Sequence, residues 1–374
     1  MYLKRIRLVN FRNYQRLDFA PSHGLNVLFG KNGQGKSNLL EAVYVTAATK
    51  SPRTARDQEM IKTGEPCAFV EAVLGREERG DIEVSLAVAR DKSKHVKINA
   101  NIGRCIDLIG EVNAVCFIPE DLKMIKGGPG ERRIVLNREI SQISRLHCHH
   151  LQQYNRVLRN RNVLIKRKGA FSEETDVWSE QLVTLGSRII KRRKQYLEEI
   201  SILAAERHRL LTERGDGLNI MYVNRVLERV GKYEELEEAD ISLAYSDLIR
   251  QEAKREDIYK TTLVGPHRDD VRIFLGNRDI HVYGSQGEQR TAVLAFKLAA
   301  MDMVKRKVRE WPVLLLDDVL SELDDQRKGY LIREISKEGI QAFITTAEER
   351  FIPFISSATA TIYRVKEGNI SNAV

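Results

Sequence analysis

Apolar and polar residues follow a strand-like pattern at the start of the chain. Apolar side chains recur at close to every second position between Leu3 and Phe19, the period of a strand with one buried face. An apolar run, Leu25-Asn-Val-Leu-Phe29, then leads into a glycine-rich loop, and the sequence from Asn38 has the composition and spacing of a helix. The pattern predicts a strand, a loop and a helix in that order.

Alternation returns in residues 68–118, where apolar side chains occupy every second position from Ile82 to Val88. This predicts antiparallel strands. Near the end of the chain a further strand is expected at Val271, a helix from Gln289 to Val304, and a buried strand in the apolar run Val313-Leu-Leu-Leu316.

The middle of the chain is predicted to be helical. Gly127-Gly-Pro-Gly130 marks a loop, after which the sequence becomes long and highly charged. We therefore expect an α/β lobe built from residues 1–137 and 261–374, with residues 138–260 forming a helical lobe or arm between the two parts.

An apolar stripe within this arm predicts packing against a partner helix of the same chain. Its members recur at spacings of mostly three and four: Trp178, Leu182, Leu185, Ile189, Tyr196, Ile200 and Leu203. Arg214-Gly-Asp-Gly217 would let the chain turn, and Glu234-Glu-Leu-Glu-Glu238 would resume a helix. A short antiparallel helical hairpin is the expected arrangement.

Charge points to a polyanionic partner. The 374 residues include 61 Lys plus Arg against 52 Asp plus Glu, a formal net charge of +9. Nucleic acid is the first candidate, although an anionic membrane surface would match the same charge. The absence of a secretory signal and of a long apolar run predicts a cytoplasmic protein with no membrane partner. Binding to DNA would make it nucleoid-associated.

The four cysteines are far apart in the sequence and form no CxxC pair, which favours reduced thiols. The segment His147-Cys-His-His150 gathers possible metal ligands. Neighbouring residues on a helix point to different faces, however, so this spacing argues against a shared metal ion.

The glycine-rich loop carries the strongest chemical motif. Gly30-Lys-Asn-Gly-Gln-Gly-Lys-Ser37 matches the Walker A pattern at every fixed position and stands between a predicted strand and a predicted helix. Its amide groups and the helix N-terminus are expected to hold phosphates, with Lys36 at the β- and γ-phosphates and Ser37 on Mg²⁺. The residues predicted to bind ATP here are Gly30, Lys31, Asn32, Gly33, Gln34, Gly35, Lys36 and Ser37.

Two carboxylates at the end of the late apolar strand are expected to complete the site. Asp317 is predicted to hold Mg²⁺, and Asp318 to orient or activate the attacking water, so that Lys36 and Asp318 are the predicted catalytic residues. An apolar run ending in two aspartates is also what a strand meeting a helix cap looks like. The Walker A loop is what favours the catalytic interpretation.

Ser285-Gln-Gly-Glu-Gln289 opens the helix before that strand. Its Ser285 hydroxyl and Gly287 backbone are candidates for a phosphate contact, together with Gln289. The alternative is an ordinary capped helix. Because Ser285 lies so far along the chain from Ser37, one explanation is that the two loops belong to opposite subunits and enclose ATP between them.

Several segments resemble a known family. The Walker A loop, the Ser285 segment and Leu314-Leu-Leu-Asp-Asp-Val-Leu-Ser-Glu-Leu-Asp324 together resemble the SMC, Rad50 and RecF group of ABC-type ATPases. Five further segments resemble the bacterial RecF family over nearly the whole chain. They are Leu8-Val-Asn-Phe-Arg-Asn-Tyr14, Ser51-Pro-Arg-Thr-Ala-Arg-Asp57, Pro119-Glu-Asp-Leu-Lys-Met-Ile-Lys-Gly127, Gly265-Pro-His-Arg-Asp-Asp270 and Gly284-Ser-Gln-Gly-Glu-Gln-Arg290.

The resemblance implies an α/β fold: an ABC-type P-loop ATPase head with a mixed sheet, plus a helical lobe. It also implies a weak, DNA-stimulated ATPase that uses ATP and Mg²⁺ as a conformational switch. Ser285 and Gly287 of one subunit would close over the γ-phosphate held by Lys36 of the other, with Ser321-Glu-Leu-Asp324 at the dimer interface. Since the wider class usually has Glu where this chain has Asp318, hydrolysis is expected to be slow.

The implied role is recombination mediation in DNA repair and replication. The implied partners are double-stranded and gapped DNA, RecR and RecO, with RecA and single-strand-binding protein as functional partners, and a second copy of the chain in an ATP-dependent homodimer. An SMC- or Rad50-like DNA tether is the alternative, but it would need a longer coiled coil with a hinge or a CxxC hook. A transporter ATPase subunit and an ATP-switched nuclease fit the sequence less well.

Some positions stay open between a functional and a structural interpretation. Gln142 is the candidate for a glutamine that senses Mg²⁺, or a polar helix residue. Thr345-Thr346 stands where the resemblance places a switch residue that senses the γ-phosphate, or simply ends a strand. Asn137 departs from the family pattern, which has an Asp there, and receives no catalytic role.

Basic residues form the last group of candidates. Arg53 and Arg56 could reach nucleotide or DNA. The stretches Arg156 to Lys168 and Lys191-Arg-Arg-Lys194 are candidate phosphate contacts, or solvated helix faces. No aromatic residues are interleaved with them, so any DNA contact is expected to use the duplex backbone.

Overall fold

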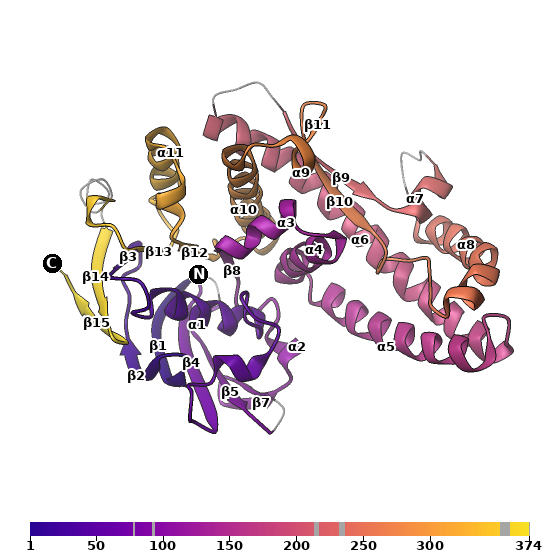
Figure 1. The fold of residues 1–374 in the computed structure, drawn as a ribbon. Helices are drawn as coiled ribbons and strands as arrows, with labels where there is room; N and C mark the ends of the chain where they lie inside the picture. Colours follow the sequence, from indigo (N-terminus) through magenta and orange to yellow (C-terminus); the bar gives the residue numbers. More distant parts are fainter. Residues whose placement is uncertain (78, 92–93, 213–216, 232–235, 352–359, 374) are drawn as a thin grey trace. The chain divides into compact units, whose positions relative to one another are not determined.

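A computed structural model describes residues 1–77, 79–91, 94–212, 217–231, 236–351 and 360–373 (Figure 1). Three sheets and the helices that cover them account for the fold, which confirms the α/β class. Two sheets have six strands each, and the third has three.

The first sheet is antiparallel throughout, in the order β2-β1-β4-β5-β6-β7. Its strands are β1 (Tyr2–Phe11), β2 (Tyr14–Phe19), β4 (Cys67–Gly75), β5 (Ile82–Ala89), β6 (His95–Ile98) and β7 (Asn101–Gly103). The alternation predicted over residues 68–118 is confirmed, because β5 buries every second residue from Ile82 to Val88. This buried face supplies one wall of the core.

The second sheet is mixed, in the order β15-β14-β3-β13-β12-β8. Its strands are β3 (Leu25–Phe29), β8 (Ala114–Phe117), β12 (Val313–Asp317), β13 (Ala342–Thr346), β14 (Ala360–Lys366) and β15 (Asn369–Asn372). All neighbours are parallel except β15, which pairs antiparallel with β14. The residues of β12 and β13 are buried throughout, as expected for parallel strands covered on both faces.

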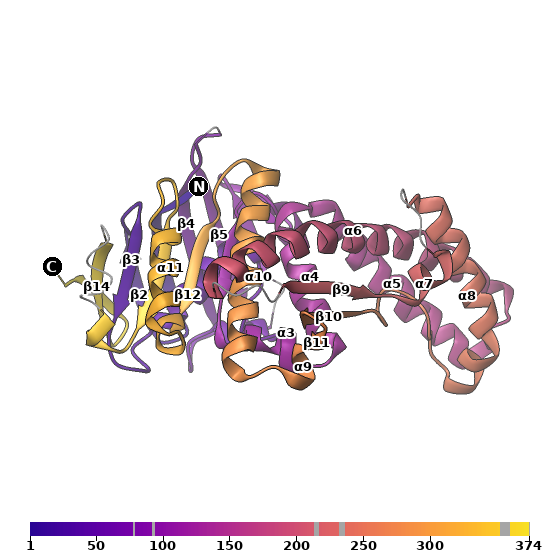
Figure 2. The ribbon, with the colours of Figure 1, turned by 90° about the horizontal axis from the view of Figure 1, so that it is seen from above.

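Helices cover the mixed sheet on both faces (Figures 1 and 2). Helix α1 (Lys36–Ala48) lies between the two six-stranded sheets and contacts strands of both. Helices α10 (Gln286–Val308) and α11 (Asp325–Ile335) lie on the opposite face. The apolar side chains of α1 join those of both sheets in one continuous core. Short helical segments link these elements: η1 (Asp57–Met60), α2 (Cys105–Leu108), η2 (Pro119–Leu122), η3 (Val319–Glu322) and η4 (Glu349–Phe351).

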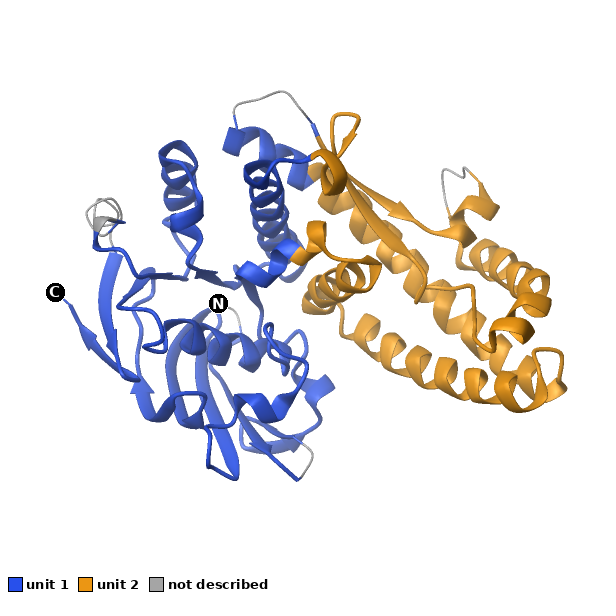
Figure 3. Ribbon diagram, viewed as in Figure 1, with its two compact units in different colours: residues 1–122, 203–217, 284–374 blue, residues 123–202, 218–283 orange. Residues whose placement is uncertain are grey.

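The chain divides into two compact units (Figure 3). Unit 1 contains residues 1–122, 203–217 and 284–374, and holds both six-stranded sheets. Unit 2 contains residues 123–202 and 218–283. Helix α6 (Glu173–Thr212) contributes its residues up to 202 to unit 2 and the remainder to unit 1.

Unit 2 is mainly helical. Its other helices are α3 (Lys123–Lys126), α4 (Pro129–Ile143), α5 (Arg145–Lys168), α7 (Arg225–Val230), α8 (Glu238–Tyr259) and α9 (Ile280–Tyr283). Its three-stranded antiparallel sheet consists of β9 (Leu218–Val223), β10 (Asp270–Leu275) and β11 (Arg278–Asp279). The α6 stripe packs as predicted, because Leu182 and Ile189 share a core with residues of α5 and α8.

The unit boundaries differ from those expected from the sequence at 137/138 and 260/261. Residues 123–137 belong with unit 2 because α3 and α4 pack there, α4 against β10. Residues 261–283 belong there because β10 pairs with β9, a strand inside the stretch expected to be helical. The turn expected at 214–217 and the helix start expected at 234 fall largely outside the described residues. Among the described residues, none of the helices has the length and apolarity to cross a bilayer.

Candidate nucleotide-binding site

The loop between β3 and α1 has a backbone that requires glycine at several points. Gly33 and Gly35 have φ values of +80° and +116°, which side chains other than glycine rarely adopt. At Gly30 the requirement is space, because a Cβ atom would lie 2.3 Å from the carbonyl oxygen of Val365 in β14. The predicted strand, loop and helix are therefore confirmed, with α1 beginning at Lys36.

Two neighbouring turns hold the loop. From the β1–β2 turn, the Asn13 side chain donates to the Gln34 carbonyl and the Tyr14 hydroxyl donates to the Gly35 carbonyl, both at 3.0 Å. From the β14–β15 turn, the Glu367 amide donates to the Gln34 side chain at 2.8 Å. These contacts give a physical role to Asn13 and Tyr14, which in the sequence are only part of a family-like segment.

The Lys36 side chain is folded back inside the loop. Its ammonium group donates to the carbonyl oxygens of Gly30 at 2.6 Å and Lys31 at 3.0 Å. Burial lowers the pKa of Lys36, while the carboxylates of Asp318 and Asp317 oppose that change. The ammonium group is therefore poorly hydrated and close to the loop amides, where a phosphate oxygen could replace its carbonyl partners.

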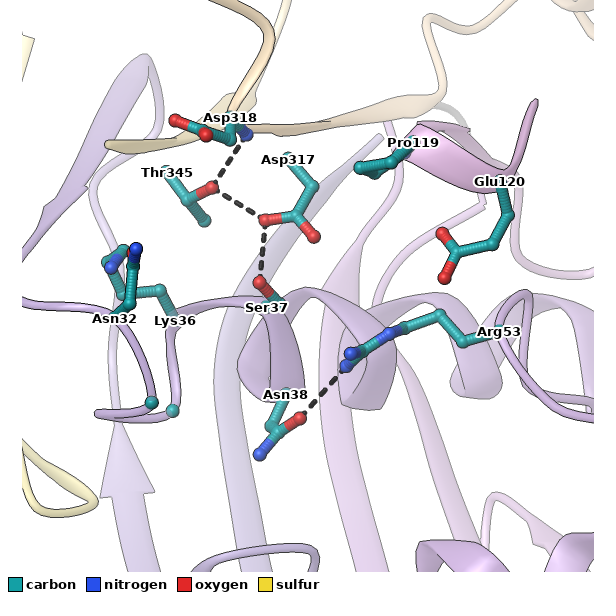
Figure 4. A pocket seen from close by; sticks show the side chains of 12 residues that line it. Asn32, Lys36, Ser37, Asn38, Arg53, Pro119, Glu120, Asp317, Asp318 and Thr345 are labelled. Atoms are coloured by element: carbon teal, nitrogen blue, oxygen red, sulfur yellow. Dashed lines mark hydrogen bonds between the residues drawn. The ribbon is translucent and has the colours of Figure 1, made fainter. Parts of the chain in front are cut away.

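A chain of hydrogen bonds joins the loop to the ends of two strands (Figure 4). The Ser37 hydroxyl donates to Asp317 Oδ1 at 2.7 Å, and the Thr345 hydroxyl donates to the same oxygen at 2.7 Å. The Asp318 amide donates to the Thr345 hydroxyl at 2.9 Å. Because β12 and β13 are parallel neighbours, Asp317 and Thr345 end at the same edge of the sheet. Thr345 and not Thr346 faces this site.

Asp318 is the first residue beyond β12 and adopts a left-handed conformation, with φ of +52°. The Ser321 hydroxyl donates to its backbone carbonyl at 2.8 Å. Loss of hydration raises the pKa of Asp318, an effect that Asp317 reinforces and Lys36 opposes. A carboxylate exposed to the pocket with a raised pKa can accept a proton from a water molecule or hold that water in place.

These groups line a polar cavity of about 330 Å³. Its walls include Lys36, Ser37, Asp317, Asp318 and Thr345, and also side chains given no part in the predicted site: Asn38, Pro119 and Glu120. Arg53, an open candidate, lines it as well, but Arg56 does not. In the sequence, only the position of Asn38 directly after the Walker A motif indicated that it could line this cavity.

Arg53 is held by helix α1. Its guanidinium donates to the Asn38 side chain at 3.0 Å and lies 3.5 Å from the buried carboxylate of Glu41. Glu41 also accepts two hydrogen bonds from Arg12, at 2.9 and 2.6 Å. Arg53 is thus positioned at the pocket wall by a buried carboxylate, which sequence adjacency could not reveal.

The Ser285 segment lies elsewhere in unit 1. Ser285 caps α10 by accepting from the Glu288 amide at 3.2 Å, and both Ser285 and Gly287 are exposed, while Gln289 is buried. None of the three is among the residues lining the cavity. The adjacent Arg290 forms an ion pair of 3.2 Å with Glu322, in the segment expected at a dimer interface.

Gln142 lies in unit 2, where it is buried in α4. Its predicted role in sensing Mg²⁺ stays a prediction. Asn137, in the same helix, accepts hydrogen bonds from Arg193 at 3.1 Å and contacts the His147 ring at 3.2 Å. These contacts give Asn137 a structural role in unit 2.

The structure removes two basic residues from the list of DNA contacts. Arg193 is buried and forms an ion pair of 3.0 Å with Asp269, and Arg161 is buried against Glu256 at 2.7 Å. Both charges are neutralised inside unit 2, by carboxylates that are distant in sequence. Among the described residues no group of three or more His, Cys, Asp or Glu could hold a metal ion.

Comparisons with known proteins agree on one family. A family model described as the RecF/RecN/SMC N-terminal domain matches residues 2–371. A DNA replication and repair protein RecF of Alkaliphilus oremlandii is 38% identical over 375 residues, covering 99% of this chain and 100% of the relative. Another, of Symbiobacterium thermophilum, is 40% identical over 375 residues, covering 99% of this chain and 98% of the relative.

Solved structures give the same result. A structure of a recombination mediator protein RecF with ATP, from a RecFOR pathway, has a TM-score of 0.90 and 32% identity and covers 100% of this chain and 98% of that one. An SMC head bound to the C-terminal winged-helix domain of ScpA has a TM-score of 0.55 and 16% identity, over 99% of this chain and 96% of that one. The second similarity shows the fold alone.

Proposed function

This chain belongs to the bacterial RecF family, within the RecF/RecN/SMC group, and from that membership we propose that it is an ATP-dependent recombination mediator in DNA replication and repair. The observation that carries the proposal is the hydrogen-bonded series Ser37, Asp317, Thr345 and Asp318, which faces Lys36 across one polar cavity. This is the donor and acceptor set that hydrolysis of a nucleoside triphosphate needs.

The loop residues fit ATP and its metal. Amide groups of the loop and the N-terminus of α1 would hold the phosphates, and Lys36 would turn from the Gly30 and Lys31 carbonyls toward them. Ser37 and Asp317 would hold Mg²⁺, since a hydroxyl and a carboxylate oxygen 2.7 Å apart are the hard donors that this ion prefers. Bound there, Mg²⁺ would neutralise charge on the β- and γ-phosphates.

ATP is proposed to join two copies of the chain. Ser285 and Gly287 are exposed at the start of α10 and do not line the cavity of their own chain. We therefore assign them to the γ-phosphate in the cavity of a second copy, with Gln289 supporting that helix end. Residues 321–324 would lie at the same interface, where Arg290 already holds Glu322.

Hydrolysis is proposed to act as a slow release switch. Asp318 would position or deprotonate the attacking water, and its short side chain places the carboxylate less far into the cavity than glutamate would. Opening of the dimer after hydrolysis would release duplex DNA at gaps. RecO and RecR would act with it in helping RecA to replace single-strand-binding protein.

Sedimentation with and without ATP tests the dimer. Wild-type protein is expected to dimerise with ATP, and Lys36→Ala should bind no nucleotide and stay monomeric. Ser285→Arg should still bind ATP as a monomer, whereas Asp318→Asn should accumulate as a dimer because hydrolysis is blocked. A Ser285→Arg protein that dimerises as well as wild type would refute the shared site.

The mediator role needs a separate measurement. ATPase rates should be compared with no DNA, duplex, single-stranded and gapped DNA, at fixed salt because backbone binding depends on it. Stimulation by gapped or duplex DNA is expected. If no DNA stimulates hydrolysis and ATP does not promote DNA binding, the mediator assignment is wrong even if the dimer forms.

A further inference from the structure

A basic pocket in unit 2 unites two sequence features that the proposed function leaves without a role. It has a volume of about 460 Å³ and is lined by His147 and His150 of α5, Arg188, Lys191 and Arg192 of α6, and Glu238 of α8. The histidine segment gathers possible metal ligands, and the Lys191 stretch is a candidate phosphate contact. The fold places them at one cavity.

The charge of this pocket is not fully compensated. Arg188 and Lys191 form surface ion pairs with Glu238 and Glu237, at 3.0 and 3.2 Å. Arg192 is exposed and forms no ion pair with any described residue. Three cationic side chains therefore face the cavity against the single lining carboxylate of Glu238.

Within the basic stretch 191–194, the residues that line the pocket differ from the others in their ion-pair partners. Arg193 is committed to Asp269, and Lys194 is paired with Glu198 on the same helix. Lys191 and Arg192 remain at the cavity, joined by Arg188 one turn earlier on α6. Spacings of three and four residues thus gather Arg188, Lys191 and Arg192 on one face of α6, where Arg192 forms no ion pair with any described residue.

The two histidines respond to this positive field. His147 is buried with its Nε2 atom against Asn137, and its Nδ1 atom has no hydrogen-bond partner in the described part of the chain. Burial lowers the pKa of both His147 and His150, and nearby arginines lower each further. Because Asn137 Oδ1 only accepts, the neutral His147 ring carries its proton on Nε2, and its Nδ1 atom is an acceptor. The cationic side chains of the cavity, and not this nitrogen, favour an oxyanion ligand.

We propose that this pocket binds a phosphate group of a DNA strand, an inference that rests on the DNA-binding role proposed above. Guanidinium groups held on a rigid helix suit phosphate oxygens, which they can contact with two donors at once. The lining also includes the exposed Leu146 and Gln195, which offer apolar and polar contacts to the adjoining sugar. An isolated phosphate ion would use only the cationic side chains.

Proton uptake should accompany this binding. His150 faces Arg188 and Arg192 of α6, His149 of its own helix and Glu238 of α8. An added phosphate charge would raise the pKa of His150, because it offsets the arginines. DNA affinity should therefore rise as the pH falls through the titration range of His150, and the rise should be smaller in His150→Gln.

The test measures binding of a labelled duplex by fluorescence anisotropy, with ATP, across a salt series. Arg192→Gln is expected to weaken binding and reduce the slope of log affinity against log salt by about 0.9, the loss of one phosphate contact. Arg250→Gln is the matched control. It removes one exposed arginine from α8 of the same unit, away from this pocket, and should leave the slope unchanged.

The outcomes separate the two proposals. If wild-type protein binds no duplex with ATP, the proposed function fails. If wild type binds but Arg192→Gln and Arg250→Gln behave alike, or His150→Gln keeps the full pH dependence, the pocket assignment is wrong. A titration with inorganic phosphate, monitored by the NMR signals of His150, completes the test. If phosphate shifts these signals, and duplex DNA neither causes the same shifts nor displaces the phosphate, the pocket is a free-phosphate site and the DNA assignment is refuted.

Discussion

Acidification is expected to destabilise unit 2 through His267, which the fold holds in its neutral form. Its Nδ1 atom lies 2.7 Å from the Tyr154 hydroxyl, and its Nε2 atom lies 3.1 Å from the Thr262 carbonyl. Because a carbonyl only accepts, Nε2 carries the proton and Nδ1 accepts from Tyr154. Burial lowers the pKa of His267 to about 4; the hydrogen bond to Thr262 opposes this change, and the nearby arginines add to it.

The direction and size of the pH effect on stability follow from the difference between the pKa of His267 in the folded and in the unfolded chain. In the unfolded chain a histidine takes up a proton near pH 6.5, whereas folded His267 resists protonation until about pH 4. Between these values the unfolded state binds more protons, so the free energy of unfolding falls as the pH falls. The contribution is complete above pH 6.5, and its loss by pH 4 amounts to about 3 kcal/mol.

Urea denaturation followed by circular dichroism, from pH 7.5 to 4.5, measures this loss. His267→Gln should start less stable because its hydrogen bonds change, but should lose less stability over the acid range. The buried His147 acts in the same direction, so His147→Gln should also flatten the profile. An equal acid-induced loss in wild type and His267→Gln would refute the argument.

Three further substitutions test unit 1 by urea denaturation and ATP titration. Gly30→Ala should cost about 1–3 kcal/mol and weaken ATP binding more than tenfold, because its Cβ would meet the Val365 carbonyl at 2.3 Å and the strands would have to separate. Tyr14→Phe should cost about 1 kcal/mol by leaving a loop carbonyl without its donor, and its ATP affinity should fall severalfold. Arg207→Met should cost about 3 kcal/mol, since it leaves the partly buried Asp302 of α10 without its ion-pair partner and Glu334 of α11 with Lys337 alone; stability equal to wild type would contradict this.

Local sequence predicted the parts of the site that local geometry builds. The Walker A loop lies between a strand and a helix because its glycines, the apolar run before it and the helical run after it are contiguous. Asp317 and Asp318 could be placed because they end an apolar strand. The structure then shows that Thr345, which the sequence left open between a switch residue and a strand end, hydrogen-bonds to Asp317 through the pairing of β12 with β13.

The sequence was less informative where charges find distant partners. Arg161 and Arg193 look like surface cations in a basic stretch, yet each is neutralised by a carboxylate more than seventy residues away. Strand β9 was missed for a similar reason. It lies in a stretch dominated by helical sequence, and the strand that stabilises it, β10, comes about fifty residues later. The burial of these arginines and the formation of β9 both depend on the tertiary fold.

The C-terminal end of α6 belongs to unit 1, where it is paired with both α10 and α11. Arg207 forms two hydrogen bonds of 2.7 Å with Asp302 of α10 and also pairs with Glu334 of α11. Helix α10 begins at the Ser285 segment, and α11 follows residues 321–324. Both segments are proposed to meet the second subunit when ATP binds. A displacement of either helix on closure would therefore act on α6 through one partly buried guanidinium, and α6 is the element from which unit 2 presents Arg188 and Arg192.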